Sequence, residues 1–180
     1  LGNDTYLFAA DAPLGTDTLS ESAGGTDTLD FSATTLGVSV NLATTTNQVV
    51  NSNLSIVLGL ATAFENVVGG AGNDLLTGNS IANVLTGNAG QDSLAGLAGD
   101  DTLAGGAGDD WYLLDADVVL GADLLSESVG GGIDTLDFSA TTGKAITLAL
   151  GSTAAQTVVA SLLTLTLSAD NTFRSEEHTS

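Results

Sequence analysis

The feature that most constrains this chain is a nine-residue repeat that fills residues 69–113. Stacked in order, its five units read GGAGNDLLT, GNSIANVLT, GNAGQDSLA, GLAGDDTLA and GGAGDDWYL. Glycine opens every unit, aspartate or asparagine stands at position six, and leucine or tyrosine stands at position eight. Three columns that stay in phase over five copies predict a solenoid built from small stacked units.

The order of residue types within a unit predicts a tight turn followed by a short strand. Positions one to six are turn formers, and the glycines at positions one and four can adopt positive φ without steric cost. Positions seven to nine alternate around an apolar residue, which is the period of a β-strand. If two units complete one turn, the position-eight side chains of both sides meet inside. We therefore expect an all-β fold, a thin parallel β-roll with a leucine core.

The same turns present oxygen atoms that suit a hard cation. Backbone carbonyls and the position-six carboxylates supply the oxygen ligands that calcium takes, about six to eight in number. The chain has 22 Asp and Glu against 2 Lys and Arg, a net charge of −20, and would repel itself when compact unless a cation neutralised it. One buried leucine contributes about 1.5–3 kcal/mol, whereas ordering each residue costs about 1.5 kcal/mol. Calcium binding would therefore have to supply folding energy.

This pattern resembles the repeat-in-toxin (RTX) family, the haemolysin-type calcium-binding repeats of secreted bacterial proteins, written GGxGxDxUx. The resemblance covers residues 69–113 closely and residues 1–7 in part. It implies a right-handed parallel β-roll, calcium held between turns two repeats apart, and export through a one-step (type I) secretion channel. By position, the implied ligands are the carboxylates of Asp74, Asp92, Asp101 and Asp110, with Asn83 in the same column and turn carbonyls around Gly70, Gly72, Gly90, Gly99, Gly106 and Gly108.

The second unit departs from the pattern. Ile81 stands in place of the position-four glycine, and Asn83 stands in place of the aspartate. Isoleucine resists positive φ and asparagine carries no charge. Stacking units two apart gives roughly three inter-turn calcium sites, and we expect the one shared by Asn83 and Asp101 to be the weakest.

A longer repeat of about 106 residues surrounds the array. Residues 6–35 return as residues 112–142 with one extra glycine. We therefore divide the chain into the end of an upstream array (1–7), a β-rich inter-array module (8–68), the calcium-binding β-roll (69–113) and a second copy of the module (114–173). Residues 174–180, RSEEHTS, resemble the translation of a sequencing adapter, and we expect them to be an artefact.

Composition excludes several function classes. An acidic chain lacks the cations that nucleic-acid binding requires. The uncharged stretches 31–64 and 145–169 are crowded with Thr, Ser, Asn and Gln and predict strands, not membrane insertion. The chain has no Cys, no Gly-x-Ser-x-Gly and no His outside residues 174–180. The repeat phase accounts for both Gly-Asp-Asp sequences, so we expect no enzyme in this segment.

Two further groups of residues carry narrower expectations. Asp27, Asp30, Asp134 and Asp137 lie in the duplicated Asp-Thr-Leu-Asp-Phe-Ser segment. The pattern predicts a strand with these acids turned outward, and an additional calcium site is the alternative. Trp111 occupies position seven, so we expect it to point away from the leucine core.

The sequence as a whole predicts an extracellular, secreted segment that binds calcium ions and folds on binding them after export. One alternative is a calcium-stiffened spacer of an adhesin, which would bring a cell-surface or adhesion partner to the parent protein, because repeated modules extend reach. Another is the accessory C-terminal region of a secreted protease or lipase.

Overall fold

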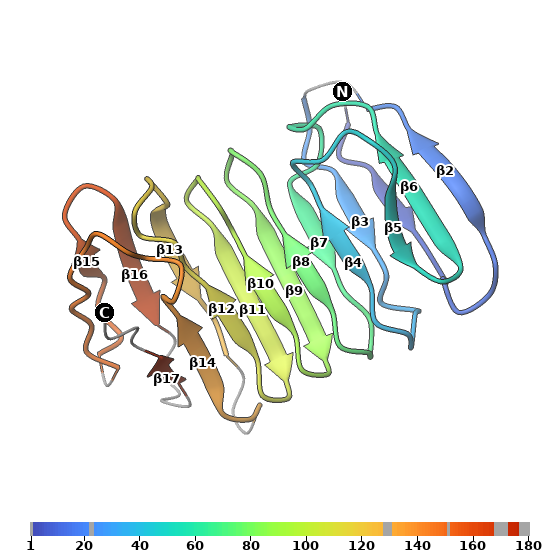
Figure 1. Cartoon of the computed structure of the whole chain (residues 1–180). Helices are drawn as coiled ribbons and strands as arrows, with labels where there is room; N and C mark the ends of the chain where they lie inside the picture. The colour runs from blue at the N-terminus through green and yellow to red at the C-terminus, as the bar shows by residue number, and fades with distance from the viewer. Residues whose placement is uncertain (1, 22–23, 128–130, 151, 168–172, 177–180) are drawn as a thin grey trace.

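The computed structural model describes residues 2–21, 24–127, 131–150, 152–167 and 173–176 of the chain. These residues form an elongated stack of strands, with the N-terminal and C-terminal modules at its two ends (Figure 1). No helix occurs in the described ranges, which confirms the all-β prediction. Leu1 of the expected upstream array and residues 177–180 of the expected artefact lie outside the described residues.

Short strands make up the whole stack. Their bounds are β1 (Thr5–Leu7), β2 (Gly15–Leu19), β3 (Thr28–Asp30), β4 (Ser39–Asn41), β5 (Gln48–Asn51), β6 (Leu54–Leu58), β7 (Asn66–Val68), β8 (Leu75–Thr77), β9 (Val84–Ala89), β10 (Ser93–Ala95), β11 (Thr102–Ala107), β12 (Trp111–Leu113), β13 (Gly121–Leu125), β14 (Asp134–Asp137), β15 (Gln156–Val159), β16 (Leu163–Leu167) and β17 (Phe173–Glu176).

Two long sheets face each other across the stack. The first has the order β1-β3-β7-β9-β11-β13-β16-β15, and the second has the order β17-β14-β12-β10-β8-β4. A three-stranded sheet, β2-β6-β5, completes the N-terminal module. Among the described strands, all pairs are parallel except the hairpins β5–β6 and β15–β16. The two sheets continue from the array into both modules, so the modules extend the same stack.

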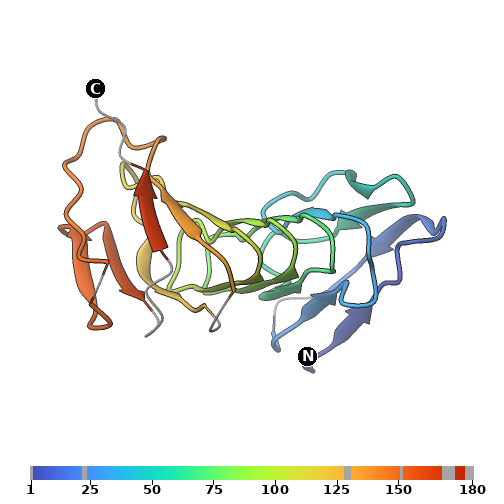
Figure 2. The same cartoon turned by 90° about the horizontal axis from the view of Figure 1, so that it is seen from below.

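Two nonapeptides complete one turn of the roll. In the first sheet Thr102 pairs with Val84, and in the second sheet Ser93 pairs with Leu75, so strands of one sheet repeat every 18 residues. Figure 2 shows the chain passing from one sheet to the other and back through tight turns. The predicted parallel β-roll is therefore confirmed. The chain alternates sides because each nine-residue unit supplies one strand and one reversal.

The core is a single row of side chains between the sheets. All five position-eight residues are fully buried: Leu76, Leu85, Leu94, Leu103 and Tyr112. In the modules the row continues through larger apolar residues such as Phe31 and Phe64, which are also buried. Position eight points inward because it lies between two outward-facing strand residues. Each turn thus buries only two large side chains from the array, which leaves little hydrophobic stabilisation per residue.

The two module copies have the same internal bonding but lie on opposite sheets. Thr34 Oγ1 accepts a hydrogen bond from the Ala10 N–H, and Thr141 Oγ1 accepts the same bond from Ala116. Yet β1 and β3 belong to the first sheet, whereas their counterparts β12 and β14 belong to the second. The array causes this change: from β7 in the first sheet to β12 in the second the chain passes through five nonapeptides, and an odd number of half-turns moves it to the other side.

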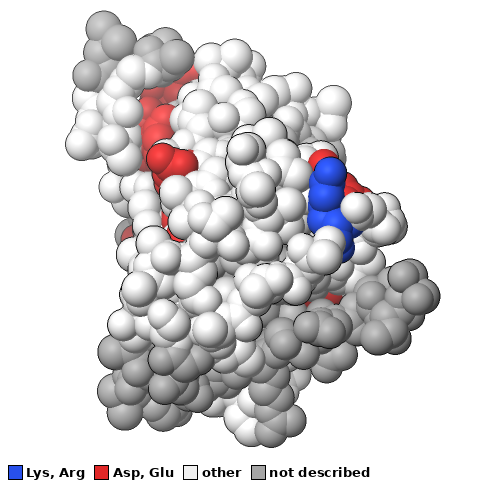
Figure 3. All heavy atoms as spheres, turned by 90° about the vertical axis from the view of Figure 1, so that its left-hand side faces the viewer, with Lys and Arg blue, Asp and Glu red and all other residues white. Residues whose placement is uncertain are grey.

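Figure 3 views the C-terminal end of the stack. Where this face is formed by described residues it is mostly uncharged, apart from a group of acidic side chains and one basic side chain. Many of the acids lie instead in the turns between the sheets.

Candidate metal centre

The position-six aspartates form a ladder along each edge of the roll. On one edge the Asp92 carboxylate (Oδ1) accepts the Asp74 N–H at 2.8 Å, and Asp110 Oδ1 accepts the Asp92 N–H at 2.8 Å. The ladder goes on when Asp134 Oδ1 accepts the Asp110 N–H at 3.1 Å. Each carboxylate therefore uses one oxygen to connect successive turns.

The opposite edge repeats this arrangement. Asp101 Oδ1 accepts the Asn83 N–H at 2.8 Å, and Asp123 Oδ1 accepts the Asp101 N–H at 3.1 Å. Units two apart are thus stacked as the sequence predicted. Position six comes just before each strand, so its side chain is fixed by the turn that precedes the strand.

The second carboxylate oxygens are the chemically exceptional atoms of the roll. Oδ2 of Asp92, Asp101 and Asp110 is buried and has no hydrogen-bond partner among the described residues. Burial raises the pKa of Asp92 to about 7, and it raises the pKa of Asp101 and of Asp110 to about 6. A buried carboxylate oxygen without a partner is costly, and a cation would remove that cost.

The glycine at position one makes the space in which these oxygens lie. A Cβ added at Gly87 would overlap Asp92 Oδ2 and would lie 2.6 Å from the carbonyl oxygen of Gly105. The same overlap with the position-six side chain recurs at Gly69, Gly78, Gly96 and Gly105. None of these position-one glycines has positive φ. The expectation that position one is glycine for its φ is therefore wrong, because glycine is needed there for space.

Positive φ occurs instead at positions two and four of the last three units. Gly90, Gly99 and Gly108 at position four have φ of 126°, 139° and 134°. Position two is Asn88, Leu97 and Gly106, with φ of 78°, 72° and 107°. Among the other predicted carbonyl donors, Gly70 and Gly72 belong to the first unit and have no positive φ. The turns are thus uniform only in the last three units.

The predicted turn carbonyls run along the stack. The carbonyl oxygens of Gly72, Gly90, Gly99 and Gly108 each lie close to the glycine one turn further on. The position-one carbonyl oxygens of Gly87, Gly96 and Gly105 lie beside Gly69, Gly78 and Gly87, in the same space as the position-six side chains. Sequence reasoning did not name these position-one carbonyls. Carboxylate and carbonyl oxygens thus converge at each turn, and this donor set fits calcium.

In the second unit the position-six side chain, Asn83, forms its hydrogen bonds within the protein and needs no cation. Asn83 Oδ1 accepts the Asn79 N–H at 2.8 Å, and Asn83 Nδ2 donates to the Glu65 carbonyl at 3.1 Å. Ile81 does not have positive φ, so this turn adopts a different backbone. The amide of asparagine provides both the acceptor and the donor that this turn requires.

Four buried acids lie outside the array, and two of them, Asp123 and Asp134, extend its ladders. Asp27, Asp123, Asp134 and Glu127 are each less than one-tenth exposed. The prediction that Asp27 and Asp134 turn outward is wrong, because they share strand parity with the buried Leu29 and Leu136; Asp30 and Asp137 are half-buried. A signal for Asp27, Asp123 and Asp134 was present in the sequence. Gly-x-Asp occurs at 25–27, 121–123 and 132–134 as it does in the array, although β13 begins at the glycine and β14 at the aspartate. Gly25, Gly121 and Gly132 have positive φ.

Residues at position five lie on the outside of the turns. Asp100 Oδ1 accepts the Ala122 N–H at 3.0 Å, and Asp109 Oδ1 accepts the Ile133 N–H at 2.9 Å. Asp109 and Asp110 thus face different environments, which accounts for the Gly-Asp-Asp sequence in structural terms. Trp111 is 42% exposed, which confirms that it points away from the core.

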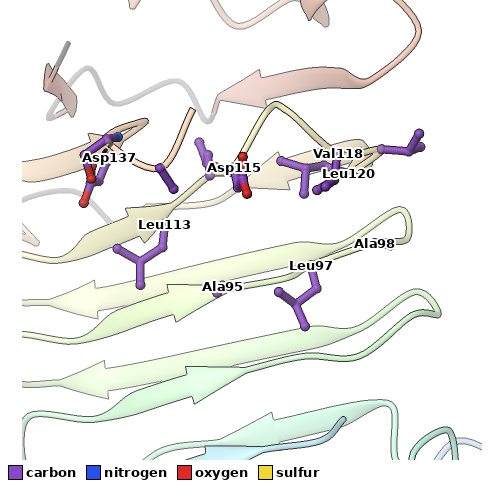
Figure 4. Close-up of a pocket in the computed structure, with 12 residues that line it drawn as sticks. Ala95, Leu97, Ala98, Leu113, Asp115, Val118, Leu120 and Asp137 are labelled. Carbon is purple, nitrogen blue, oxygen red and sulfur yellow. Dashed lines mark hydrogen bonds between the residues drawn. The ribbon is translucent and has the colours of Figure 1, made fainter. Parts of the chain in front are cut away.

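An apolar cavity of about 490 Å³ lies beside the roll, between the array and the second module. Figure 4 shows Leu97 and Leu113 on successive strands and loops of the roll, near Val118 and Leu120 of the module. Asp115 and Asp137 line the same cavity. No ladder carboxylate is among its lining residues, so it is separate from the turns.

Comparison with known proteins supports the assignment of the array. Residues 63–80 and 77–112 match the family model described as "RTX calcium-binding nonapeptide repeat (4 copies)". A stretch of 63 residues is 46% identical to a metalloprotease AprA of Pseudomonas entomophila (strain L48), and a metallopeptidase AprA of Pseudomonas marginalis is equally similar over the same length. The match covers 33% of this chain but only 13% of each relative. The predicted resemblance to RTX repeats is thus confirmed for the array.

Proposed function

We propose that this RTX array binds calcium ions through its position-six carboxylates, and that binding supplies the free energy that folds the segment. The ligands are Asp74, Asp92, Asp101 and Asp110, assisted by carbonyl oxygens of the glycine-rich turns. When bound, calcium neutralises the carboxylates and holds successive turns together. Asn83 lies in the same column, but its amide is already satisfied by Asn79 and Glu65, so its turn contributes least.

The observation that carries this proposal is the set of buried Oδ2 atoms without partners on Asp92, Asp101 and Asp110. Each lies beside a glycine that cannot be enlarged without displacing it. Isolated buried charges are strongly destabilising. A ladder of such groups persists only if protons or cations compensate it, and at neutral pH a cation does so better.

A calcium titration of the chain tests the proposal. We expect the β signal in circular dichroism to rise cooperatively at millimolar calcium, together with a change in Trp111 fluorescence. Magnesium is the control, because it demands a rigid octahedral shell and gives up water reluctantly. If calcium produces neither signal, the proposal is wrong.

We further propose that the segment is exported in unfolded form and folds outside the cell. At low calcium no cation neutralises the carboxylates, and the burial of the small leucine core does not offset the repulsion between them in the folded state. Calcium outside the cell would then fold the chain where it acts. Refolding rates measured at low and at millimolar calcium test this step, since we expect folding only at the higher concentration.

Two candidate roles for the parent protein are each favoured by one observation. The relatives are named metalloprotease and metallopeptidase, which favours an accessory region of a secreted protease; a protease or lipase catalytic domain in the same gene would support this role. The duplicated module, with equivalent hydrogen bonds in both copies, favours a stiff spacer of an adhesin. Among the described residues no helix is of a length and hydropathy that could cross a membrane.

A further inference from the structure

Three carboxylates meet where the array joins the second module. Asp110 ends the array, whereas Glu127 and Asp134 belong to the module, and all three side chains are buried. One potential ligand atom from each lies within 4.8 Å of the others. These residues, which we call the seam cluster, come from three separate segments of the chain.

One carboxylate oxygen of the cluster has no hydrogen-bond partner among the described residues. It is Oδ2 of Asp110, a residue that is 0% exposed. This oxygen lies beside Gly105, whose N–H donates to Glu127 Oε1 at 3.3 Å. Asp110 Oδ2 and the Glu127 carboxylate thus both lie beside Gly105. The missing hydrogen-bond partner of this oxygen is an observation separate from the gathering of acids.

Glu127 is held in place by the last turn of the array. Its Oε1 accepts a short hydrogen bond from the Tyr112 hydroxyl, and its Oε2 accepts the Gly106 N–H at 3.3 Å. Within the array, the next glycine-rich turn occupies the corresponding space. Glu127 thus supplies a carboxylate where the repeat pattern would supply another turn.

The same set of residues recurs in the first module. Asp4, Tyr6, Glu21 and Asp27 have the same order as Asp110, Tyr112, Glu127 and Asp134, with one glycine more in the second copy. There too the tyrosine hydroxyl donates to the glutamate, and the Asp27 carboxylate accepts the Asp4 N–H at 2.8 Å. The order of these residues and two of their hydrogen bonds are therefore repeated, whereas Asp4 is exposed and the buried three-acid cluster is found at the seam.

We propose that Asp110, Glu127 and Asp134 form a calcium site that fastens the module to the end of the array. Three carboxylates without nitrogen or sulfur donors favour a hard divalent cation, and calcium tolerates such irregular oxygen sets better than magnesium. This inference rests on the proposed function, since it assumes that calcium loads the array. It adds a site that includes two ligands outside the nonapeptides.

Calcium stoichiometry of the full chain tests the seam site. In equilibrium dialysis, we expect Glu127→Gln and Asp134→Asn each to bind one calcium fewer than the unchanged chain, while the rise in β signal remains. Asp137→Asn is the matched control, because Asp137 lies on the same strand as Asp134 but its Oδ1 caps the Ser139 N–H. We expect this control to bind as many ions as the unchanged chain.

The outcomes separate the two claims. If the unchanged chain takes up no calcium, the proposed function fails and the seam site with it. If the chain takes up calcium but neither substitution lowers the number bound, only the seam site is refuted.

A second measurement leaves the seam acids intact and so does not depend on whether their variants fold. In a chain that carries both Trp111→Phe and Tyr6→Phe, Tyr112 is the remaining tyrosine. Terbium bound at the seam would lie next to it, and we expect tyrosine-excited terbium emission that calcium displaces. Absence of this emission in a chain that still takes up calcium would overturn the proposal.

Discussion

Replacement of Asp92 by asparagine separates the cost of its buried charge from its role in binding calcium. The pKa of Asp92 is raised from 3.8 to about 7, first by burial and then by the charges of Asp74 and Asp110. At pH 8 without calcium, ionisation of this group costs the fold about 4 kcal/mol, at about 1.4 kcal/mol per pKa unit. Asparagine removes this cost, but its amide N–H₂ needs an acceptor, which costs about 1–3 kcal/mol if none is found.

We therefore expect Asp92→Asn to stabilise the calcium-free fold by about 1–3 kcal/mol at pH 8. At pH 5 the gain should disappear, because Asp92 is then protonated in the folded chain. With calcium present the order should reverse at pH 8, because the unchanged chain gains a ligand charge that the variant lacks.

Urea unfolding in chelator, followed by circular dichroism at pH 8 and at pH 5, measures the effect. Asp137→Asn is the control, since its side chain is half-buried on the outside of a strand. The reasoning is refuted if Asp92→Asn is equally destabilising at both pH values, because the carboxylate would then carry no charge cost in the fold.

Three further predictions concern the array. Gly87→Ala should cost about 1–3 kcal/mol of stability through overpacking against Asp92 and should weaken calcium binding. The control is Gly143→Ala, whose added Cβ would lie 3.4 Å from the nearest atom; it should change stability by less than about 0.5 kcal/mol in the same calcium-loaded melts. The folded-state pKa of Asp92 is raised, so the calcium-free fold should gain stability as pH falls from 8 to 5. Over the same range the calcium concentration at the midpoint of the circular dichroism change should rise, because protons compete with calcium for the carboxylates. A calcium-free fold that loses stability over this range would contradict the prediction. In calcium, Leu94→Ala should cost about 2–5 kcal/mol, and Leu75→Ala, at a site 44% exposed, about 0.5 kcal/mol; equal losses in urea melts would show that position eight is not the core.

The sequence was sufficient to predict the structure of the array, because each nine-residue period corresponds to one turn and one strand. Turn residues, a strand and an apolar position recur in phase, so the stacking of Thr102 on Val84 and the burial of Leu85 could be predicted. The modules were harder, because their strands are separated by spacings that vary. Hairpins such as β5–β6 depend on contacts within the folded module and leave no fixed period.

The site was predicted only in part, for a related reason. Column conservation within the array identified Asp92 and Asp110, but Glu127 belongs to no column. Its place in the seam cluster follows from the path of the chain after β13, which spacing alone does not give. Asp134 was misassigned although it shares strand parity with the buried Leu136 and is the aspartate of the Gly-x-Asp sequence at 132–134.

The odd number of nonapeptides determines how a longer chain of this kind would present its modules. The first module leaves the roll on one sheet and the second leaves it on the other. Repetition of array and module would therefore produce a two-fold screw arrangement, in which successive modules lie on alternate sides of the roll. Deletion or insertion of one nonapeptide would make the count even and bring all modules onto one side. Whether the number of nonapeptides is odd or even thus determines on which side of the roll each module lies.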